Sequence, residues 1–334
     1  MTSTLVGNAA QSPAPSSMKA WRVHEFGPPE AMIFETVPRP DPGPGEVLVK
    51  VHAAGVGPWD GSIRAGRSAL PQPLPLTLGS DPSGEVAALG SGISNMAVGD
   101  QVFGVTNTQF LGAYAEYAVA WAGMLAKKPS SLSYVEAASV PVIAVTAWQG
   151  LFDQARLEAG QTVVIHGAAG NVGAYAVQLA RRARLRSIAT AGTKDDYVRA
   201  LGADKVVDYH TQRFEDEVKD ADAVLDLVGG ETQTRSFQVL RPGGKLISTV
   251  SQPDQDRAKH HGVTAAFFLV EVTTERLRRI AELIDRGELK TRVGAVLPLA
   301  DAREAHMMLE GRRPLPRGKI ILNVEAAGEV TPAA

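Results

Sequence analysis

Residues 162–173 read Thr-Val-Val-Ile-His-Gly-Ala-Ala-Gly-Asn-Val-Gly, and this stretch decides the fold. Its opening apolar run is typical of a strand that is covered on both faces of a parallel sheet. An Ala-x-Gly-x-x-Gly turn follows, in which Ala168 stands where the first glycine is usual. Gly170 would let the backbone approach a pyrophosphate, and Gly173 would let the next helix pack against the strand. The stretch therefore predicts the first strand–turn–helix unit of a Rossmann dinucleotide-binding domain, with phosphates at the helix N-terminus.

Strand and helix patterns alternate around this motif. Strands are predicted at residues 162–166, 187–190, 205–208, 223–226, 245–249 and 264–270, with helices between them that include 172–182 and 232–240. This alternation indicates βαβ units and a doubly wound parallel sheet. A Gly-rich turn without a ligand is the alternative interpretation, but the surrounding β/α pattern favours dinucleotide binding.

The residues before this domain form a β-rich pattern. From Met18 to about Pro141, short strand patterns such as Glu46–His52 are separated by Pro and Gly. They predict a small, partly barrel-like β domain. Residues 293–324 return to short strands, and we expect them to rejoin this first domain.

The chain is thus divided into a tail and two domains. Residues 1–17 are rich in Ser, Ala, Pro and Thr, and are interpreted as a disordered tail rather than a signal peptide. The catalytic domain is predicted from residues 18–141 and 272–334. The Rossmann domain, residues 142–271, is inserted between these two segments.

Charge and composition exclude several classes of function. The formal net charge of the 334 residues is −2, so there is no basic surface to suggest a nucleic-acid partner. No apolar run approaches the roughly 20 residues that cross a bilayer, so no membrane association is expected. The chain has no cysteine, which excludes disulfides and thiolate zinc sites and is compatible with the reducing cytoplasm.

The end of the second predicted Rossmann strand indicates which dinucleotide is bound. Enzymes that use NAD usually place an acidic residue there, to bind the ribose 2′-hydroxyl. In this chain the strand runs into Gly192, Thr193 and Lys194, which can hydrogen-bond and neutralise a 2′-phosphate. Asp195 and Asp196 argue for NAD, but they are interpreted as partners of the positive end of the next helix. NADPH is therefore the predicted cofactor.

Short motifs in a fixed order link the chain to a known superfamily. They are Pro44–Val49, Leu78–Gly84, Val98–Gly104, Gly112–Tyr117, Ala144–Trp148, Leu201–Asp204, Arg241–Gly244 and Arg317–Ile320. With them the chain, from Met18 to Val324, resembles the medium-chain dehydrogenase/reductase superfamily, specifically the zinc-free quinone oxidoreductase branch that includes zeta-crystallin. The resemblance implies a GroES-like catalytic domain into which the Rossmann domain is inserted, with the active site in the cleft between them. It also implies a homodimer that pairs through the strand at residues 264–270.

The resemblance further implies a set of cofactor contacts. They are Thr146 near the nicotinamide ribose, Asn171 and Val172 at the pyrophosphate, Lys194 and Tyr209 at the 2′-phosphate, Val228 beside the adenosine, backbone groups of Phe268, Leu269 and Val270 at the carboxamide, and Lys319 on the phosphate side. Zinc-dependent relatives bind their metal through Cys and a His-Glu pair that follows a Gly. Here that piece reads Gly79-Ser80-Asp81. A catalytic zinc of that type is therefore excluded on ligand grounds, and no metal ligand is assigned.

Two departures from the branch fall where a substrate would bind. The chain has Gly57-Pro58-Trp59-Asp60 where an Asn is frequent, and Arg67 and Ser68 follow Arg64-Ala65-Gly66 where a Tyr is frequent. Trp59, Asp60 and Ser68 are therefore candidates for the substrate cleft, and no catalytic residue is assigned.

The predicted function is metal-free hydride transfer from NADPH to a small-molecule acceptor. A quinone or another conjugated carbonyl is expected, because negative charge then spreads to a remote oxygen. That oxygen needs a proton donor, for which water, Ser68 or a tyrosine are the options. The alternatives are a reductase of enone or enal double bonds, and a non-catalytic sensor that binds NADPH.

Overall fold

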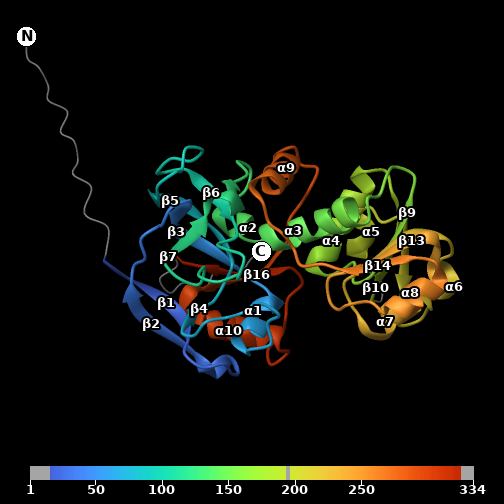
Figure 1. Ribbon diagram of the computed structural model, residues 1–334, viewed down its shortest axis with the longest axis horizontal. Coiled ribbons are helices and arrows are strands. Elements are labelled where there is room, and N and C mark those ends of the chain that lie inside the picture. The colour runs from blue at the N-terminus through green and yellow to red at the C-terminus, as the bar shows by residue number, and fades with distance from the viewer. Residues whose placement is uncertain (1–15, 193–195, 325–334) are drawn as a thin grey trace, which may run out of the picture.

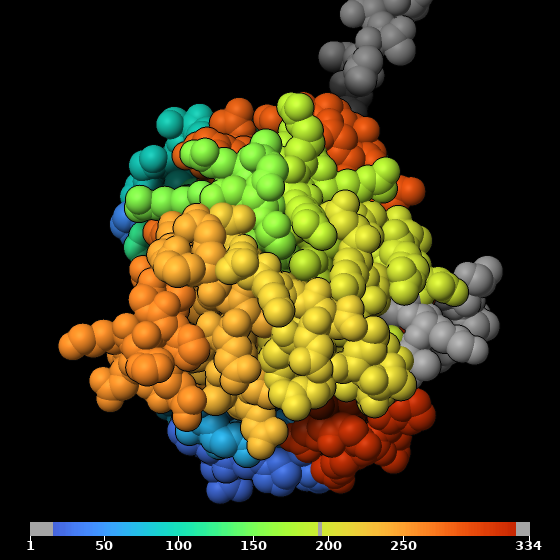
Figure 2. Space-filling model, turned by 90° about the vertical axis from the view of Figure 1, so that its right-hand side faces the viewer, coloured from blue at the N-terminus to red at the C-terminus, as the bar shows by residue number. Residues whose placement is uncertain are grey.

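The computed structural model describes residues 16–192 and 196–324 and contains two lobes. The β-rich lobe, built from both ends of the chain, lies on the left of Figure 1, and the lobe that contains β9 to β14 lies on the right. Figure 2 shows the molecule from the side of this second lobe, whose yellow and orange surface covers most of that face.

The second lobe is a Rossmann domain with a six-stranded sheet. Its strands are β9 (Thr162–Ile165), β10 (Arg186–Ala191), β11 (Lys205–Asp208), β12 (Ala221–Asp226), β13 (Leu240–Ser248) and β14 (Thr264–Phe267). All neighbours are parallel, in the order β11-β10-β9-β12-β13-β14. The predicted doubly wound parallel sheet is confirmed. The strand order reverses direction beside β9, which is where ligands bind in sheets of this type.

Helices cover both faces of this sheet. They are α3 (Pro141–Trp148), α4 (Asn171–Arg182), α5 (Asp196–Leu201), α6 (Phe214–Glu217), α7 (Gly230–Ser236) and α8 (Gln255–His261). The next helix, α9 (Thr274–Asp285), packs against α3 between the two lobes. Val163 and Ile165 of β9 pack into one apolar cluster with α4, whereas Val164 packs into another with Ile188. Consecutive side chains of a strand point to opposite faces, so an unbroken apolar run fits a strand buried on both sides.

The first lobe is a GroES-like domain that is closed by the C-terminus. Its strands are β1 (Ser17–Val23), β2 (Met32–Pro38), β3 (Glu46–Val56), β4 (Leu76–Thr77), β5 (Asp81–Leu89), β6 (Gln101–Gly104), β7 (Tyr117–Trp121), β8 (Leu125–Lys127), β15 (Val293–Pro298) and β16 (Lys319–Asn323). They form a three-stranded sheet, β2-β1-β4, and a seven-stranded sheet in which β16 is antiparallel to β3. The C-terminal segment therefore rejoins the first domain, as the sequence predicts. β1 begins at Ser17, which the sequence assigned to the end of the tail; residues 1–15 lie outside the described part of the chain.

The remaining elements are short. They are the helices α1 (Pro58–Arg64), α2 (Tyr134–Ala137) and α10 (Ala302–Leu309), the 3₁₀ turns η1 (Pro29–Ala31), η2 (Ala122–Met124), η4 (Phe237–Val239) and η5 (Leu299–Asp301), and the π-helical turn η3 (Gln149–Gln154). Within the described residues, no helix has the length and apolar character needed to cross a bilayer.

Candidate active site

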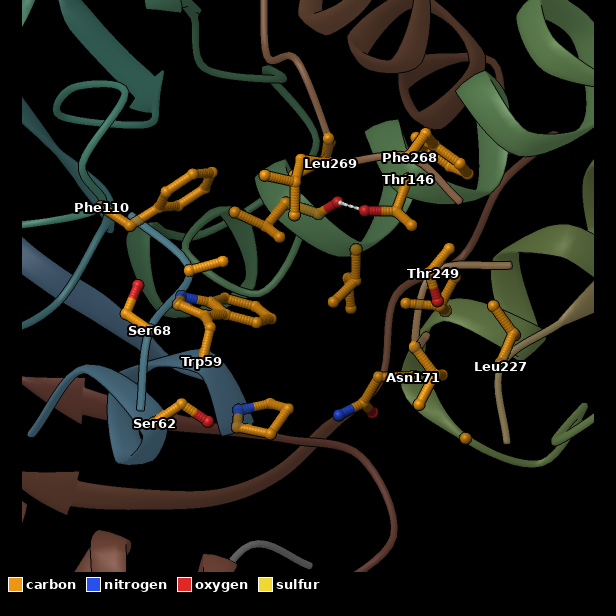
Figure 3. A pocket seen from close by; sticks show the side chains of 18 of the residues that line it. Trp59, Ser62, Ser68, Phe110, Thr146, Asn171, Leu227, Thr249, Phe268 and Leu269 are labelled. Carbon is orange, nitrogen blue, oxygen red and sulfur yellow. Dashed lines mark hydrogen bonds between the residues drawn. The ribbon is translucent and has the colours of Figure 1, made fainter. Parts of the chain in front are cut away.

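A cavity of about 630 Å³ opens between the two domains. Its Rossmann wall includes Gly167 after β9, Leu227 after β12 and Thr249 after β13. The cavity therefore lies at the carboxyl ends of the central parallel strands, where such sheets bind ligands. Figure 3 shows Trp59, Ser62, Ser68 and Phe110 on the opposite wall, which belongs to the GroES-like domain.

The Gly-rich turn offers free hydrogen-bond donors to this cavity. Gly170 is the N-cap of α4, and no side-chain hydrogen bond caps the helix there. The backbone N–H groups of Asn171, Val172 and Gly173 have no acceptor among the described residues. A helix N-terminus with unsatisfied N–H groups and a positive dipole end is a binding site for phosphate. The turn therefore fits the pyrophosphate of a dinucleotide.

Gly173 allows the close packing that this turn needs. A Cβ at this position would lie 2.3 Å from the carbonyl oxygen of Gly167 and 2.6 Å from Cα of Ala168. Both neighbours are backbone atoms, which cannot rotate away as a side chain can. The glycine thus lets α4 start directly against the end of the turn.

Most of the predicted cofactor and substrate residues line this one cavity. They are Trp59, Ser68, Thr146, Gly170, Asn171, Val172, Gly173, Phe268, Leu269, Val270 and Lys319. The strand predicted to reach Val270 ends at Phe267, because the backbone leaves the sheet there and turns along the cavity. The backbone N–H groups of Leu269 and Val270 have no acceptor within the described residues, so they remain available to a carboxamide.

Three of the predicted cofactor residues that the structure describes lie outside the cavity lining: Gly192, Tyr209 and Val228. Tyr209 is 60% exposed and Val228 is 50% exposed. A Cβ on Gly192 would lie 3.6 Å from the Tyr209 hydroxyl, so these two residues are neighbours at the ends of β10 and β11. This exposed corner suits the adenosine end of a dinucleotide, which lies beyond the pyrophosphate site. Thr193 and Lys194, predicted at the 2′-phosphate, fall outside the described residues.

Asp60 does not line the cleft, and that prediction is wrong. Its carboxylate is completely buried, where it accepts hydrogen bonds from the backbone N–H of Gly57 (2.8 Å) and the hydroxyl of Tyr114 (2.9 Å). Burial raises the pKa of Asp60 to about 7, against the lowering effect of these hydrogen bonds and of Lys319. Asp60 therefore fixes the start of α1 and has no contact with a substrate.

A pH-dependent contribution to stability follows from this burial. The folded pKa of Asp60 is raised above its ordinary 3.8, so the folded state holds a proton that the unfolded state has lost between about pH 4 and 7. The contribution of Asp60 to stability therefore falls as pH rises through this window. Relative to wild type, Asp60→Asn should gain stability from about pH 4 to 7 and level off above it. The gain should be a few kcal/mol at most, since one pKa unit is worth about 1.4 kcal/mol.

Denaturant unfolding of both proteins across this pH range measures the difference. Taking the difference removes the contribution of other groups, such as His166, whose pKa burial lowers to about 4. A difference that stays constant from pH 4 to 8 would contradict the raised pKa of Asp60.

The structure contains an ion pair between Lys319 and Asp81 that the sequence did not reveal. The Lys319 ammonium lies 3.1 Å from Oδ2 of Asp81, and both side chains are 1% exposed. The ammonium also lies 4.2 Å from the centre of the Trp59 ring, whose Nε1 donates to the Ser80 hydroxyl. Lys319 is thus engaged on the GroES-like wall, and this geometry does not support its predicted role at the cofactor phosphates.

Asp81 belongs to the Gly79-Ser80-Asp81 segment, which the family resemblance implies stands in place of the zinc-ligand segment of metal-dependent relatives. Among the described residues there is no group of three or more His, Cys, Asp or Glu side chains placed to bind a metal. Burial raises the pKa of Asp81, and the ammonium of Lys319 opposes this rise. A lysine cation thus partners the carboxylate of this segment.

Two serine hydroxyls remain on the substrate side of the cavity. Ser68 Oγ accepts hydrogen bonds from the backbone N–H of Leu70 (3.1 Å) and from Gln72 Nε2 (3.5 Å), so its own O–H is available to donate. Ser62 also lines the cavity. Thr146 instead donates its hydroxyl hydrogen to the carbonyl of Val142 at 2.7 Å. No tyrosine of the described residues lines the cavity, so the lining does not support a tyrosine as the proton donor. Ser68 and Ser62 are the serines that could donate there.

Comparison with known proteins agrees with this geometry. Residues 43–130 match the family described as alcohol dehydrogenase GroES-like domain, and residues 201–322 match the family described as zinc-binding dehydrogenase. Human quinone oxidoreductase is 32% identical over 308 residues, which cover 86% of this chain and 93% of the human protein. The chain belongs to the quinone oxidoreductase family. It is therefore an oxidoreductase of the medium-chain dehydrogenase/reductase superfamily.

Solved structures of the quinone oxidoreductase family share the whole fold. The quinone oxidoreductase of Coxiella burnetii is 33% identical, with a TM-score of 0.85 over 92% of this chain and all of that one. A mycobacterial protein, solved in complex with NADPH, is 31% identical, with a TM-score of 0.82 over 92% of this chain and all of that one. A relative thus binds NADPH on the same fold.

Proposed function

We propose that this quinone oxidoreductase-like protein transfers hydride from NADPH to a quinone or another conjugated carbonyl, without a metal. The observation that carries the proposal is the cavity itself, which joins a free helix N-terminus to a wall built from Trp59 and Phe110. NADPH, when bound, supplies the hydride. The NADPH complex of the mycobacterial relative and the absence of cysteine from the sequence support this choice of cofactor and mechanism.

The residues of the chain bind and orient the two reactants. The N–H groups at the start of α4 would hold the pyrophosphate, and those of Leu269 and Val270 would orient the carboxamide. Trp59 and Phe110 offer flat apolar surfaces to a conjugated acceptor. The Ser68 hydroxyl, which lines the cavity, would donate a hydrogen bond where negative charge develops on the acceptor oxygen.

An acceptor panel tests the proposal. The loss of the absorbance band of reduced nicotinamide would be followed with a para-quinone, an ortho-quinone, an enone, an enal and a saturated aldehyde. Rapid loss with the quinones and little with the saturated aldehyde is the expected result, since a saturated carbonyl has no conjugated system to spread the charge. Turnover restricted to the enone and enal would favour a double-bond reductase, because the same cavity also fits these acceptors. Binding of NADPH without any turnover would favour a sensor.

The cofactor preference depends on Lys194, which follows β10 in the sequence. Lys194→Glu should raise the KM for NADPH by about tenfold or more, because a carboxylate would repel the 2′-phosphate. The KM for NADH, which has no such phosphate, should change little or fall. Equal changes in the KM for NADPH and for NADH would show that Lys194 does not bind the 2′-phosphate.

The assembly and location are also part of the proposal. β14 is the edge strand of the Rossmann sheet, and an edge with unpaired backbone groups can pair with a second copy. We therefore expect a homodimer, and a monomeric mass in light scattering would contradict it. A cytoplasmic location fits the lack of cysteine, and cell fractionation tests it.

A further inference from the structure

Arg67 lies in a turn that is held firmly at the substrate side of the cavity. The turn follows α1. The backbone N–H of Gly66 donates to the carbonyl of Ile63 (3.0 Å), and that of Arg67 donates to the carbonyl of Ser62 (2.8 Å). Gly66 has a φ of +69°, and a Cβ there would lie 2.8 Å from the ring of Phe26. The backbone of Arg67 is therefore fixed before any substrate binds.

In the described part of the chain, the guanidinium of Arg67 has no counter-charge. Arg67 and Lys319 are the charged residues among the described lining of the cavity, and no Asp or Glu is part of that lining. Lys319 is paired with Asp81, whereas no hydrogen bond or ion pair engages the Arg67 side chain within the described residues. An unpaired cation that lines a cavity without a carboxylate is suited to an anionic group of the ligand.

The position of Arg67 separates it from the phosphate end of the cofactor. Its turn lies between Ser62 and Ser68. In Figure 3 these two serines lie with Trp59 on the GroES-like wall, across the cavity from Asn171. The pyrophosphate site at the start of α4 has its own donors. Arg67, an exposed residue of the same turn and of the cavity lining, therefore lies on the acceptor side of the cavity rather than at the phosphate site.

We propose that Arg67 selects acceptors whose conjugated ring or enone carries an anionic substituent, such as a carboxylate or a sulfonate. This inference rests on the proposed function and names the substrate class for the same site. The aromatic wall would take the conjugated body, and Arg67 would bind the substituent, which takes no part in the hydride transfer. Arg67 is thus a specificity-determining residue.

A matched pair of acceptors tests the inference. An ortho-naphthoquinone and its ring sulfonate would be assayed with NADPH in the wild type, Arg67→Gln and Arg278→Gln. Arg278 is exposed on α9 and does not line the cavity, so Arg278→Gln makes the same change in net charge away from the site. Arg67→Gln should raise the KM for the sulfonate by about tenfold with kcat preserved, as expected for one charge-assisted contact. The KM for the neutral quinone should change by less than about twofold, because it lacks the group that Arg67 binds.

The outcomes separate this inference from the proposed function. A similar change for both quinones in Arg67→Gln, or an equal change in Arg278→Gln, would overturn the role of Arg67. If the wild type reduces neither quinone, the proposed function fails, but calorimetry of the sulfonate binding to the protein with oxidised NADP still tests Arg67. A Kd for the sulfonate that is about tenfold higher in Arg67→Gln would then support the role of Arg67, and an unchanged Kd would contradict it. The difference should shrink at high salt, because Arg67 is exposed.

Discussion

Lys319→Met is expected to lower the free energy of unfolding by about 3–5 kcal/mol, because it leaves a buried carboxylate without its partner. Asp81 would retain a hydrogen bond from the backbone N–H of Val142 at 3.2 Å, but no cation. Trp59 would also lose the ammonium that lies against its ring. Because Trp59 and Lys319 both line the cavity, the KM for the acceptor should rise as well.

Two further variants identify the cause of this loss. Lys127→Met removes an exposed partner of Asp100, and its cost should stay below about 1 kcal/mol because surface pairs contribute little. The double variant with Lys319→Met and Asp81→Leu should recover much of the stability, because it removes the unpaired charge. Denaturant unfolding measures all three. If Lys319→Met were as stable as the wild type, the Lys319–Asp81 pair would not contribute to the stability of the fold.

Gly173→Ala is expected to weaken the binding of NADPH by tenfold or more and to cost about 1–3 kcal/mol of stability. The new methyl group would lie within 2.6 Å of two backbone atoms, at Gly167 and Ala168. The start of α4 would have to move away from the turn, and its free N–H groups would move with it. The loss of affinity should be similar for NADH, because both cofactors carry the pyrophosphate.

Gly123→Ala is the matched control for this prediction. A Cβ at Gly123 would meet no atom within 4 Å, so the same substitution should leave stability and cofactor affinity nearly unchanged. Titration calorimetry with each dinucleotide measures the affinities. An NADPH affinity of Gly173→Ala equal to that of the wild type would show that the close packing does not position the phosphate site.

The Rossmann domain could be predicted because its signals are local. The apolar run of β9, the glycines of the turn and the following helix lie within one stretch of about 20 residues. The apolar run that marks a strand buried on both faces, and the turn that leaves a helix N-terminus open, are both visible in consecutive residues. The same locality explains why the pattern of residues predicts Gly170 and Gly173 at the cofactor site, whereas Asn171 and Val172 followed from the family resemblance.

The substrate side of the site is decided by tertiary structure. Asp60 follows Trp59 in sequence, yet Trp59 lines the cavity whereas Asp60 points into the core toward Tyr114. The helical turn at this point sends successive side chains in different directions, so the sequence could not separate the two.

The pairing of charges also depends on residues that are distant in the chain. Lys319 and Asp81 are 238 positions apart, and antiparallel contacts of β3 with β5 and β16 bring them together. The sequence by itself thus determined the fold, and it predicted the phosphate site and the cofactor from local patterns. Only the packed sheets decided that Lys319 has a buried partner, and that Arg67 has none among the described residues, because such pairing depends on which side chains meet in the folded chain.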